Sequence, residues 1–525
     1  MKKEEDKWYK NKGYPHLTNA YNLTVQGNGL KNKIQDPSFV AKYAFFPLFH
    51  INIKNRRYKK SKDRTRSHNS IKDGIKKSNA KIRPLHYANH LDAMIFGYYS
   101  EILQNNYEKE LKHNPHLNAA ATAYRRIPIE EGSDKNKSSI HFAKEVFEEV
   151  KKRSKTEKEV VVLAFDIKSF FSTLNHRFLY KEWCENIGKD KLPKDHLNVF
   201  KAATNFSFIN KDQLRAKPKN KNGKRSGFDE KRLAKIRNKY GVNAFFESAQ
   251  AFRQAVKRGE IRIYKNSFRD KDSGEVIGIP QGLPISATLA NIYLKKFDLD
   301  VLDKLQSENG FYRRYSDDII VVCKKDSMEQ VENFVLKAIQ KYRVEISPEK
   351  TEKFIFKKAV LDGKERFVSH KIEDSTLAIN KPLNYLGFEF YGYQTLIKSA
   401  NLAKFYRRMI YAVKSKTNRA KKIAAEYPSD KPVIFKNQLF RLYTKHDLDD
   451  QNTPRKRRYK IIKKIETGEY RVSSKEGKYR NSGNYFSYIK RSAEIMNAPE
   501  ISKQINGDKA KKIFNQALER WMMEE

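Results

Sequence analysis

Two short apolar segments that carry aspartates at one end constrain the fold of this chain most. The first, VVVLAFD, is a continuous apolar run closed by Asp166, and the second, FYRRYSDDIIVV, places Asp317 and Asp318 between apolar flanks. The first pattern predicts a buried strand over residues 160–165. The second predicts two short strands joined at Ser316 and Asp317, so both segments are expected in the core of one sheet.

The aspartates of these segments point to metal chemistry when they are taken together. A single aspartate that closes a strand or occupies a turn is often only a structural cap, and that interpretation stays open for each residue alone. Two like charges beside a core strand are costly unless a cation neutralises them. Mg²⁺ prefers a few carboxylates with water and phosphate oxygens, and a pair of such ions can catalyse phosphoryl transfer.

A third segment, GIPQGLPISATLANIYL, spans residues 278–294. Its glycines and prolines predict a shaped loop that leads into a helix, although alone it is an ordinary Gly/Pro turn. Helices are predicted by apolar periodicity over residues 86–103, 140–150, 285–299, 328–342, 404–427 and 510–523, and a strand over 385–391. Strands and helices alternate in the middle of the chain and helices dominate both ends, which is typical of an α+β protein.

The charge of the chain predicts a polyanionic partner. The 525 residues include 108 Lys and Arg against 62 Asp and Glu, a net charge of +46. Such a charge attracts nucleic acids and makes binding depend on salt, although an A/T-rich genome also enriches lysine. A hydrophobic content of 39% excludes a wholly disordered basic tail. Three basic stretches, at residues 54–81, 211–239 and 454–464, are predicted to be loops or insertions that are either solvated or in contact with phosphates.

Other features of the composition indicate the compartment. The longest apolar runs fall far short of the ~20 residues of a membrane span, so no membrane association is expected. Two cysteines are too few for a disulfide framework or a four-cysteine zinc site. The basic N-terminal segment has no apolar core of a secretory signal. These observations predict a reduced, cytoplasmic setting.

Asp166, the PQG loop and the YSDD turn, in this order, resemble motifs A, B and C of reverse transcriptases. PEKT at residues 348–351 resembles motif D, and YLGF at residues 385–388 resembles motif E, the primer grip. The resemblance covers about residues 160–395. It implies an RNA-directed DNA polymerase of α+β class, a right-hand polymerase with reverse-transcriptase fingers and palm followed by a mainly helical thumb.

Further segments are similar to blocks of bacterial defence-associated reverse transcriptases, of the unknown-group and abortive-infection lineage. They are KIRPLHYANHLDAMIFGYYSEIL, AYRRIPIEEGSDKNKSSIHFAKEVF and GNYFSYIKRSAEIM. The resemblance implies an anti-phage role in the bacterial cytoplasm, with a non-coding RNA as template or scaffold. It also implies dNTP substrates, a DNA product, a protein hydroxyl as a primer and a homo-oligomer. The expected division is N-terminal extension and fingers at 1–155, palm at 156–395 and a thumb-like, basic, mainly helical domain at 396–525.

The resemblance also implies a role for individual residues. Asp166, Asp317 and Asp318 are the expected catalytic residues, and with the backbone of Ile167 they are expected to hold two Mg²⁺ ions, or Mn²⁺ in their place. The expected dNTP-binding residues are Arg125, Arg126, Ser169, Phe170, Phe171, Gln281 and Lys350. The expected primer and template contacts are Tyr315, Gly282, Tyr385, Leu386 and Gly387.

Each residue that is expected to contact the nucleotide would do so for a different physical reason. The backbone from Ile167 to Phe170 would turn its N–H groups toward the triphosphate. The ring of Phe171 matches the steric gate that excludes a ribose 2′-hydroxyl, or it is a plain core residue. Lys350 would donate a proton to pyrophosphate or bind a phosphate, or it is an exposed lysine. Arginine suits bidentate phosphate binding, but the sequence leaves open which arginine of the AYRRIPI segment does so.

Other functions remain as alternatives at this point. A retron or group II intron type of reverse transcriptase shares the same motifs, although no endonuclease or RNase H cluster is recognisable after residue 395. A catalytically idle palm could serve as an RNA-binding module, which the intact set of three aspartates disfavours. The basic and aromatic C-terminal segment suits a grip on nucleic acid, or it is a helical support domain.

Overall fold

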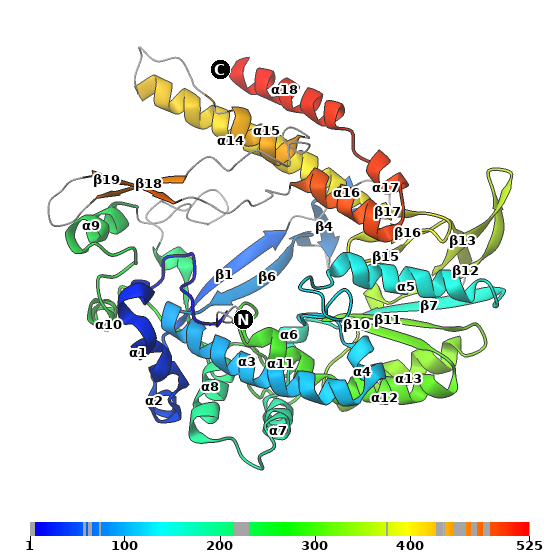
Figure 1. The fold of residues 1–525 in the computed structure, drawn as a ribbon, viewed down its shortest axis with the longest axis horizontal. Coiled ribbons are helices and arrows are strands. Elements are labelled where there is room, and N and C mark those ends of the chain that lie inside the picture. Colours follow the sequence, from blue (N-terminus) through cyan, green and yellow to red (C-terminus); the bar gives the residue numbers. More distant parts are fainter. Residues whose placement is uncertain are drawn as a thin grey trace.

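The structure is a computed structural model, and it describes residues 6–55, 59–60, 66–72, 75–214, 230–373, 376–426, 434, 436–444, 458–463, 470–475 and 484–523. A six-stranded sheet lies between two layers of helices, a four-stranded sheet lies to one side, and long C-terminal helices lie above (Figure 1). No helix in these described ranges combines the length and apolar character that a membrane crossing requires.

The six-stranded sheet has the order β10-β11-β7-β12-β13-β14, and all neighbours are antiparallel. Its strands are β7 (Glu159–Asp166), β10 (Phe311–Tyr315), β11 (Asp318–Lys324), β12 (Glu352–Leu361), β13 (Lys364–Glu373) and β14 (Thr376–Ile379). The strands β7 and β11 are central neighbours, so the predicted buried strand and the predicted hairpin are confirmed.

Side chains of β7 alternate between two hydrophobic clusters. Val161 and Leu163 belong to the cluster on one face of the sheet, and Val160 and Val162 belong to the cluster on the other. Successive residues of a strand point to opposite faces. Because both faces are covered, the positions of β7 from Val160 to Leu163 are all apolar, which explains the unbroken valine-rich run.

The two layers that cover the sheet come from different parts of the chain (Figure 1). One layer consists of α3 (His90–His113), α4 (Pro115–Ala120), α7 (His176–Asn186), α11 (Ser286–Tyr293), α12 (Lys295–Ser307) and α13 (Met328–Lys341). The other consists of α5 (Ser139–Arg153), α16 (Tyr485–Met496) and the small sheet β15 (Leu383–Tyr385), β16 (Phe388–Phe390) and β17 (Thr395–Ile397).

The four-stranded sheet has the order β6-β1-β8-β9. Its strands are β1 (Leu48–Asn55), β6 (Lys81–Tyr87), β8 (Ser207–Asn210) and β9 (Tyr264–Lys265). Around it lie α1 (Leu23–Gln35), α2 (Pro37–Lys42), α8 (Lys194–Thr204), the 3₁₀ turn η1 (Lys211–Leu214), α9 (Glu230–Tyr240) and α10 (Ala249–Lys257). This sheet therefore joins strands from the expected fingers range and the expected palm range.

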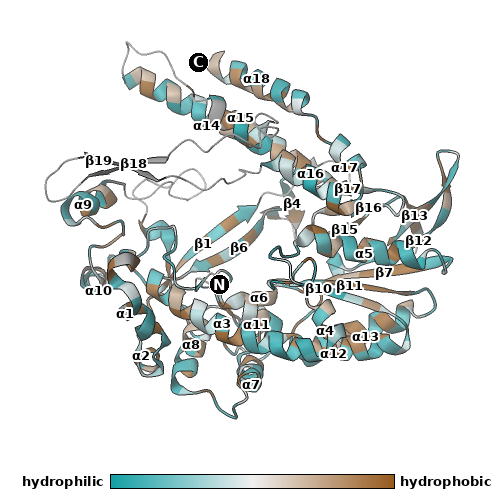
Figure 2. Ribbon diagram, viewed as in Figure 1, coloured by the Kyte–Doolittle hydropathy of each residue, from teal (hydrophilic) through white to brown (hydrophobic). Residues whose placement is uncertain are grey.

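The C-terminal helices form a separate packed group. They are α14 (Ser399–Glu426), α15 (Lys436–Tyr443) and α18 (Gly507–Met523). The short helix α17 (Glu500–Lys503) packs instead with the cluster of α5 and α16, and β18 (Arg458–Lys463) pairs with β19 (Tyr470–Lys475). Met409 and Val413 of α14 pack against Leu439 of α15 and Phe514 of α18. Brown and teal residues alternate along α14 and α18 in Figure 2, as expected for helices that are apolar on one side.

Several predicted elements are corrected by the structure. The helix predicted over residues 285–299 is two helices, because the chain departs from helical geometry at Leu294. A one-residue break leaves the apolar periodicity nearly unchanged, so the pattern could not reveal it. The helix predicted over residues 86–103 begins at His90, because the residues before it complete β6. The strand predicted over residues 385–391 is a hairpin that turns at Leu386 and Gly387.

The basic stretches are also more ordered than predicted. The stretch at 54–81 contains two short hairpins, β2 (Lys59–Lys60) with β3 (Arg66–Ser67) and β4 (Asn69–Lys72) with β5 (Ile75–Ser78). The stretch at 211–239 contains η1 and most of α9. Parts of all three stretches lie outside the described residues, and the described part of the third forms β18. Charged, exposed strands lack the alternation of polar and apolar residues by which strands are recognised.

Candidate active site

The three aspartates of the sequence motifs lie at one end of the central strands. Asp318, the first residue of β11, pairs directly with Asp166, the last residue of β7. Asp317 lies in the turn before β11, where its carbonyl accepts a hydrogen bond of 3.0 Å from the Ile167 N–H. Ser316 has a left-handed φ of 62°, which lets the turn close in two residues. The strand register therefore places Asp166 opposite Asp318, with Asp317 in the turn next to them.

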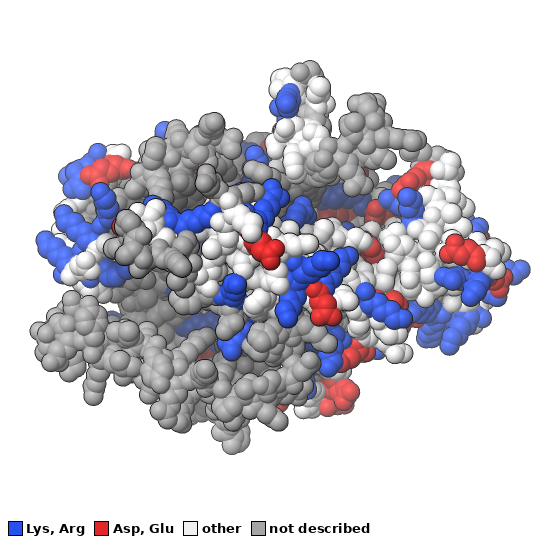
Figure 3. Space-filling model, turned by 90° about the horizontal axis from the view of Figure 1, so that it is seen from above, with Lys and Arg blue, Asp and Glu red and all other residues white. Residues whose placement is uncertain are grey.

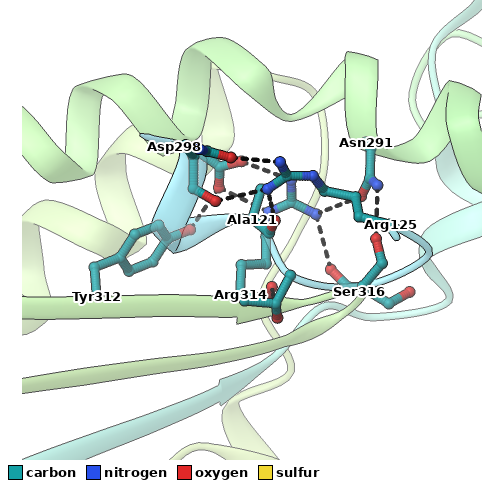
Figure 4. A network of polar contacts seen from close by, with 10 residues as sticks. Ala121, Arg125, Asn291, Asp298, Tyr312, Arg314 and Ser316 are labelled. Atoms are coloured by element: carbon teal, nitrogen blue, oxygen red, sulfur yellow. Dashed lines mark hydrogen bonds and ion pairs between the residues drawn. The ribbon is translucent and has the colours of Figure 1, made fainter. Parts of the chain in front are cut away.

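A fully buried ion pair lies next to this turn (Figure 4). Arg314 Nη2 lies 2.6 Å from Asp298 Oδ2, and neither side chain has exposed surface. The Arg314 Nε donates to Asp298 Oδ1 at 2.7 Å, as does the Tyr312 hydroxyl. Arg314 Nη1 donates to the carbonyl of Ser316 at 3.3 Å and to Asn291 Oδ1 at 3.4 Å. The pair thus ties the turn to α11 and α12.

The loop before α5 is attached to the same turn. The Thr122 N–H donates to the carbonyl of Arg314 at 3.0 Å, and Asn291 Nδ2 donates to the carbonyl of Ala123 at 2.9 Å. The hydroxyls of Tyr124 and Ser316 lie 3.2 Å apart. These contacts place residues 122–124 beside the YSDD turn.

The two arginines of this loop have different surroundings, which corrects one predicted ligand. The guanidinium of Arg125 donates five hydrogen bonds inside the protein: to the carboxylate of Glu108, to the side chain and carbonyl of Asn118, and to the carbonyl of Ala121. Only 3% of its side chain is exposed. Arg125 therefore has a structural position, and Arg126, which is exposed, is the arginine that reaches solvent.

The backbone N–H groups after Asp166 were predicted to face the triphosphate, and the structure leaves only some of them free to do so. The N–H groups of Ile167 and Lys168 donate to the carbonyls of Asp317 and Glu345, so they cannot turn toward a triphosphate. Ser169, with a left-handed φ of 51°, precedes the short helix α6 (Phe170–Thr173). The side chain of Phe170 is buried in the core, so only its backbone remains for the predicted nucleotide contact.

The predicted steric gate lies against the PQG loop. Phe171 is half-buried, and its carbonyl accepts a hydrogen bond of 2.7 Å from the Ile279 N–H. The Gly278 N–H donates to the carbonyl of Leu174 at 2.7 Å. Gly278 has a φ of 75°, and a Cβ atom there would lie 2.5 Å from the carbonyl oxygen of Ser172. Glycine is therefore required where the loop meets this segment.

The next part of the loop meets strand β6. The carbonyl of Gln281 accepts a hydrogen bond of 2.9 Å from the His86 N–H. Gly282 has a φ of 119°, and a Cβ atom there would lie 2.4 Å from the carbonyl oxygen of His86. The sequence predicted that Gln281 and Gly282 contact the nucleotide and the template. In the structure, these two residues also pack the loop against β6.

Cations lie close to the acidic centre. The ammonium group of Lys350, at the end of the 3₁₀ turn η2 (Pro348–Lys350), forms an ion pair with Asp166. Burial and the charge of Asp317 raise the pKa of Asp318 to about 6, whereas the charges of Lys81 and Lys398 lower it. Neither Lys81 nor Lys398 could be recognised from the sequence as part of the site, because neither belongs to a motif with a defined spacing.

The acidic centre fits a divalent cation by its donor chemistry. Among the described residues, no group of three His, Cys, Asp or Glu side chains is arranged to hold a metal ion. Burial first, and then the like charge of Asp317, nevertheless raise the pKa of Asp318, and a bound cation would offset both effects. The carbonyl of Ile167 accepts no backbone hydrogen bond from the described residues, so it is available as the predicted fourth ligand.

The predicted primer contacts are partly corrected. The side chain of Tyr385 is 3% exposed, and its hydroxyl has no hydrogen-bond partner among the described residues. Because the Tyr385 ring is buried, it cannot touch a primer in this arrangement. Leu386 and Gly387 form the half-buried turn beside it, and the Gly387 carbonyl accepts a hydrogen bond from the Lys398 N–H. Tyr315 is half-buried and paired with Asp318.

A comparison with protein families matches residues 224–390 to the family described as reverse transcriptase (RNA-dependent DNA polymerase). Residues 224–390 are therefore similar to a reverse transcriptase domain. The match includes the PQG loop, the YSDD turn and Lys350, and it begins after Asp166. The reverse transcriptase domain is a nucleotidyltransferase domain, and such domains use divalent metal ions.

The solved structures that resemble the chain include telomerases. The apo telomerase of Candida tropicalis, truncated from its C-terminal domain, has 13% identity and a TM-score of 0.36, and the alignment covers 62% of this chain and 54% of that one. Telomerase from Candida albicans with a telomeric RNA fragment has 12% identity and a TM-score of 0.33, covering 70% and 48%. The chain therefore spans about half the length of these structures. No curated protein matches the chain.

Proposed function

We propose that the protein is an RNA-directed DNA polymerase whose catalytic residues are Asp166, Asp317 and Asp318. The observation that carries this proposal is the register of β7 and β11, which sets Asp318 opposite Asp166 with Asp317 in the adjoining turn. The reverse transcriptase domain supports the same reaction. The proposed division into fingers, palm and thumb-like domain at 1–155, 156–395 and 396–525 goes with it.

The three carboxylates and the carbonyl of Ile167 would hold two Mg²⁺ ions. When bound, these ions would lower the pKa of the attacking hydroxyl and offset the charge on the leaving pyrophosphate. Asp318 would act mainly through its charge. Lys350 would leave its ion pair with Asp166 to bind a phosphate of the nucleotide, since an ammonium can exchange one anionic partner for another.

The nucleotide would lie between the aspartates and the loops around them. Arg126 and the half-buried Lys81 would bind its phosphates. The ring of Phe171, whose backbone is held by the Ile279 N–H, would exclude a 2′-hydroxyl. Gln281 would contact the base or the template, and the turn of Leu386 and Gly387 would contact the primer.

Synthesis by the purified protein tests this proposal. With Mg²⁺, an RNA template and labelled nucleotides, the protein should incorporate dNTPs and not rNTPs. The variant Asp317→Asn should lose at least about a thousandfold in rate, because one metal ligand is removed. Phe171→Ala should accept rNTPs with little loss of dNTP incorporation. Equal use of both nucleotides by the unaltered protein would contradict the proposal.

The biological role that we propose is anti-phage defence in a bacterial cytoplasm, with a non-coding RNA as template or scaffold. It rests on the similarity of the segments that flank the palm to defence-associated reverse transcriptases. Cells that express the protein should show fewer phage plaques, and cells that express Asp317→Ala should not. Sequencing of RNA and DNA that co-purify with the protein would identify the template, and a structured RNA encoded beside the gene would favour a retron instead.

A further inference from the structure

A groove of about 700 Å³ lies along α14 where that helix meets α15, outside the residues that match the reverse transcriptase family. Its charged and aromatic lining is Lys404, Arg407, Arg408, Tyr411, Lys416 and Tyr443. At a rise of 1.5 Å per residue, the lining residues of α14 extend over ~18 Å.

The groove concentrates positive charge that the described residues do not neutralise. The helix α14 contains eight Lys and Arg residues and a single acid, Glu426. Within the described ranges, none of the four cations of the groove forms an ion pair, whereas Lys422 at the end of the helix pairs with Glu426. Lys414 lies on the side facing α18, with its ammonium 3.6 Å from the ring centroid of Trp521. Lys and Arg side chains spread over the described part of the face shown in Figure 3.

The groove also displays an aromatic ring to solvent. Tyr411 is 72% exposed, in the middle of the cationic residues, and the neighbouring Ile410 is 37% exposed. Lys404, Arg408 and Tyr411 follow one another at spacings of four and three residues, so they share one face of the helix. An exposed ring between cations offers a surface on which a base can stack while its phosphates are bound.

We propose that this groove, apart from the polymerase centre, binds single-stranded nucleic acid. The four cations bind successive phosphates, and Tyr411 stacks on one base. A single strand fits better than a duplex because the faces of paired bases are covered by their neighbours, whereas an unpaired base can lie flat on the ring. RNA and DNA strands share this chemistry, so both are used in the test.

The test measures fluorescence anisotropy of labelled twelve-nucleotide oligo-rU and oligo-dT, and of a duplex of the same length. The protein carries Asp317→Asn and the buffer contains no divalent metal, so no synthesis occurs. Adding Tyr411→Ala should weaken binding of the single strands about tenfold and binding of the duplex less than about twofold. Replacing Arg407 and Arg408 by Ala should reduce the slope of log K against log salt by about 1.4.

Lys422→Ala is the matched control, because it removes a cation from the same helix outside the groove. It should change the affinity less than about twofold. Equal weakening by Lys422→Ala and Tyr411→Ala, or no weakening by Tyr411→Ala, would overturn the proposal. Tyr411 is exposed, so circular dichroism should show an unchanged fold.

Photocrosslinking locates the strand independently. Oligonucleotides with 5-iodouridine or 5-iododeoxyuridine should crosslink to the peptide that contains Tyr411. Crosslinks that fall only within residues 160–395 would contradict the proposal. In protein with an intact Asp317, the Tyr411→Ala variant should still extend a primer at saturating template. Loss of strand binding therefore tests the groove, whereas loss of primer extension tests the polymerase proposal.

Discussion

Arg314 and Asp298 form a bidentate ion pair without exposed surface beside the YSDD turn. Arg314 comes from β10 and Asp298 from α12, so the pair joins the hairpin that carries the aspartates to the second helix after the PQG loop. The same guanidinium donates to the carbonyl of Ser316 in the turn. The position of the aspartates therefore depends on a charge pair that is buried away from any substrate.

Asp298→Asn should destabilise the protein by about 3–5 kcal/mol, because it leaves the Arg314 charge buried without its partner. Urea unfolding followed by circular dichroism measures the change. The control is Glu365→Gln, which breaks an ion pair with Lys358 whose side chains are 64% and 73% exposed. That change should cost less than about 1 kcal/mol. Similar losses for the two variants would refute the structural role of the buried pair.

Gly278→Ala and Gly282→Ala should abolish most polymerase activity, because each new Cβ would collide with a backbone carbonyl at 2.5 Å or 2.4 Å. Gly363→Ala is the matched control: Gly363 also has a positive φ, 72°, but no atom lies within 4 Å of the position that its added methyl group would take. It should lose only about 1–2 kcal/mol of stability from backbone strain. Primer extension measures the loss of activity, and thermal unfolding measures the loss of stability. An equal loss of activity in all three variants would contradict the predicted collisions.

Arg125→Ala and Arg126→Ala should affect different properties. Arg125→Ala removes five internal hydrogen bonds and leaves the carboxylate of Glu108 without its partner, so unfolding should become easier by about 2–4 kcal/mol. Arg126→Ala should leave stability within about 0.5 kcal/mol and raise the KM for dNTPs. Steady-state kinetics measures the KM for dNTPs, and urea unfolding measures the change in stability. An unchanged KM in Arg126→Ala would remove this residue from the nucleotide site.

The protein without divalent cations should lose stability as pH rises through about 6. Burial and the Asp317 charge raise the pKa of Asp318 above its unfolded value of 3.8. Its stabilising contribution is therefore complete below pH 3.8 and is lost as Asp318 ionises. At pH 8, Asp318→Asn should be more stable than the unaltered protein by up to about 2–3 kcal/mol, and this advantage should shrink toward pH 4. Urea unfolding in EDTA measures the difference, and a pH-independent value would contradict the prediction.

Local sequence patterns were sufficient for the centre of the sheet. The apolar run before Asp166 and the apolar flanks of Asp317 and Asp318 predicted β7, β10 and β11, because strands buried on both faces leave a strong signal. Patterns were less informative where the signal is interrupted by one or two residues. The break at Leu294 and the turn at Leu386 and Gly387 are examples, since neither changes the average hydrophobicity of its segment.

The sequence by itself determined that two acids end or begin core strands and that a third lies in the turn beside them, and hence where a metal-dependent centre is expected. Only the tertiary structure decided which cations face that centre. Arg125 and Arg126 are identical in type, but Glu108 of α3 pairs with one of them and leaves the other in contact with solvent. Lys81 and Lys398 act on Asp318 although they are far from it in the chain. Electrostatic interactions depend on distance in space, and that distance is set when the sheets and helices pack.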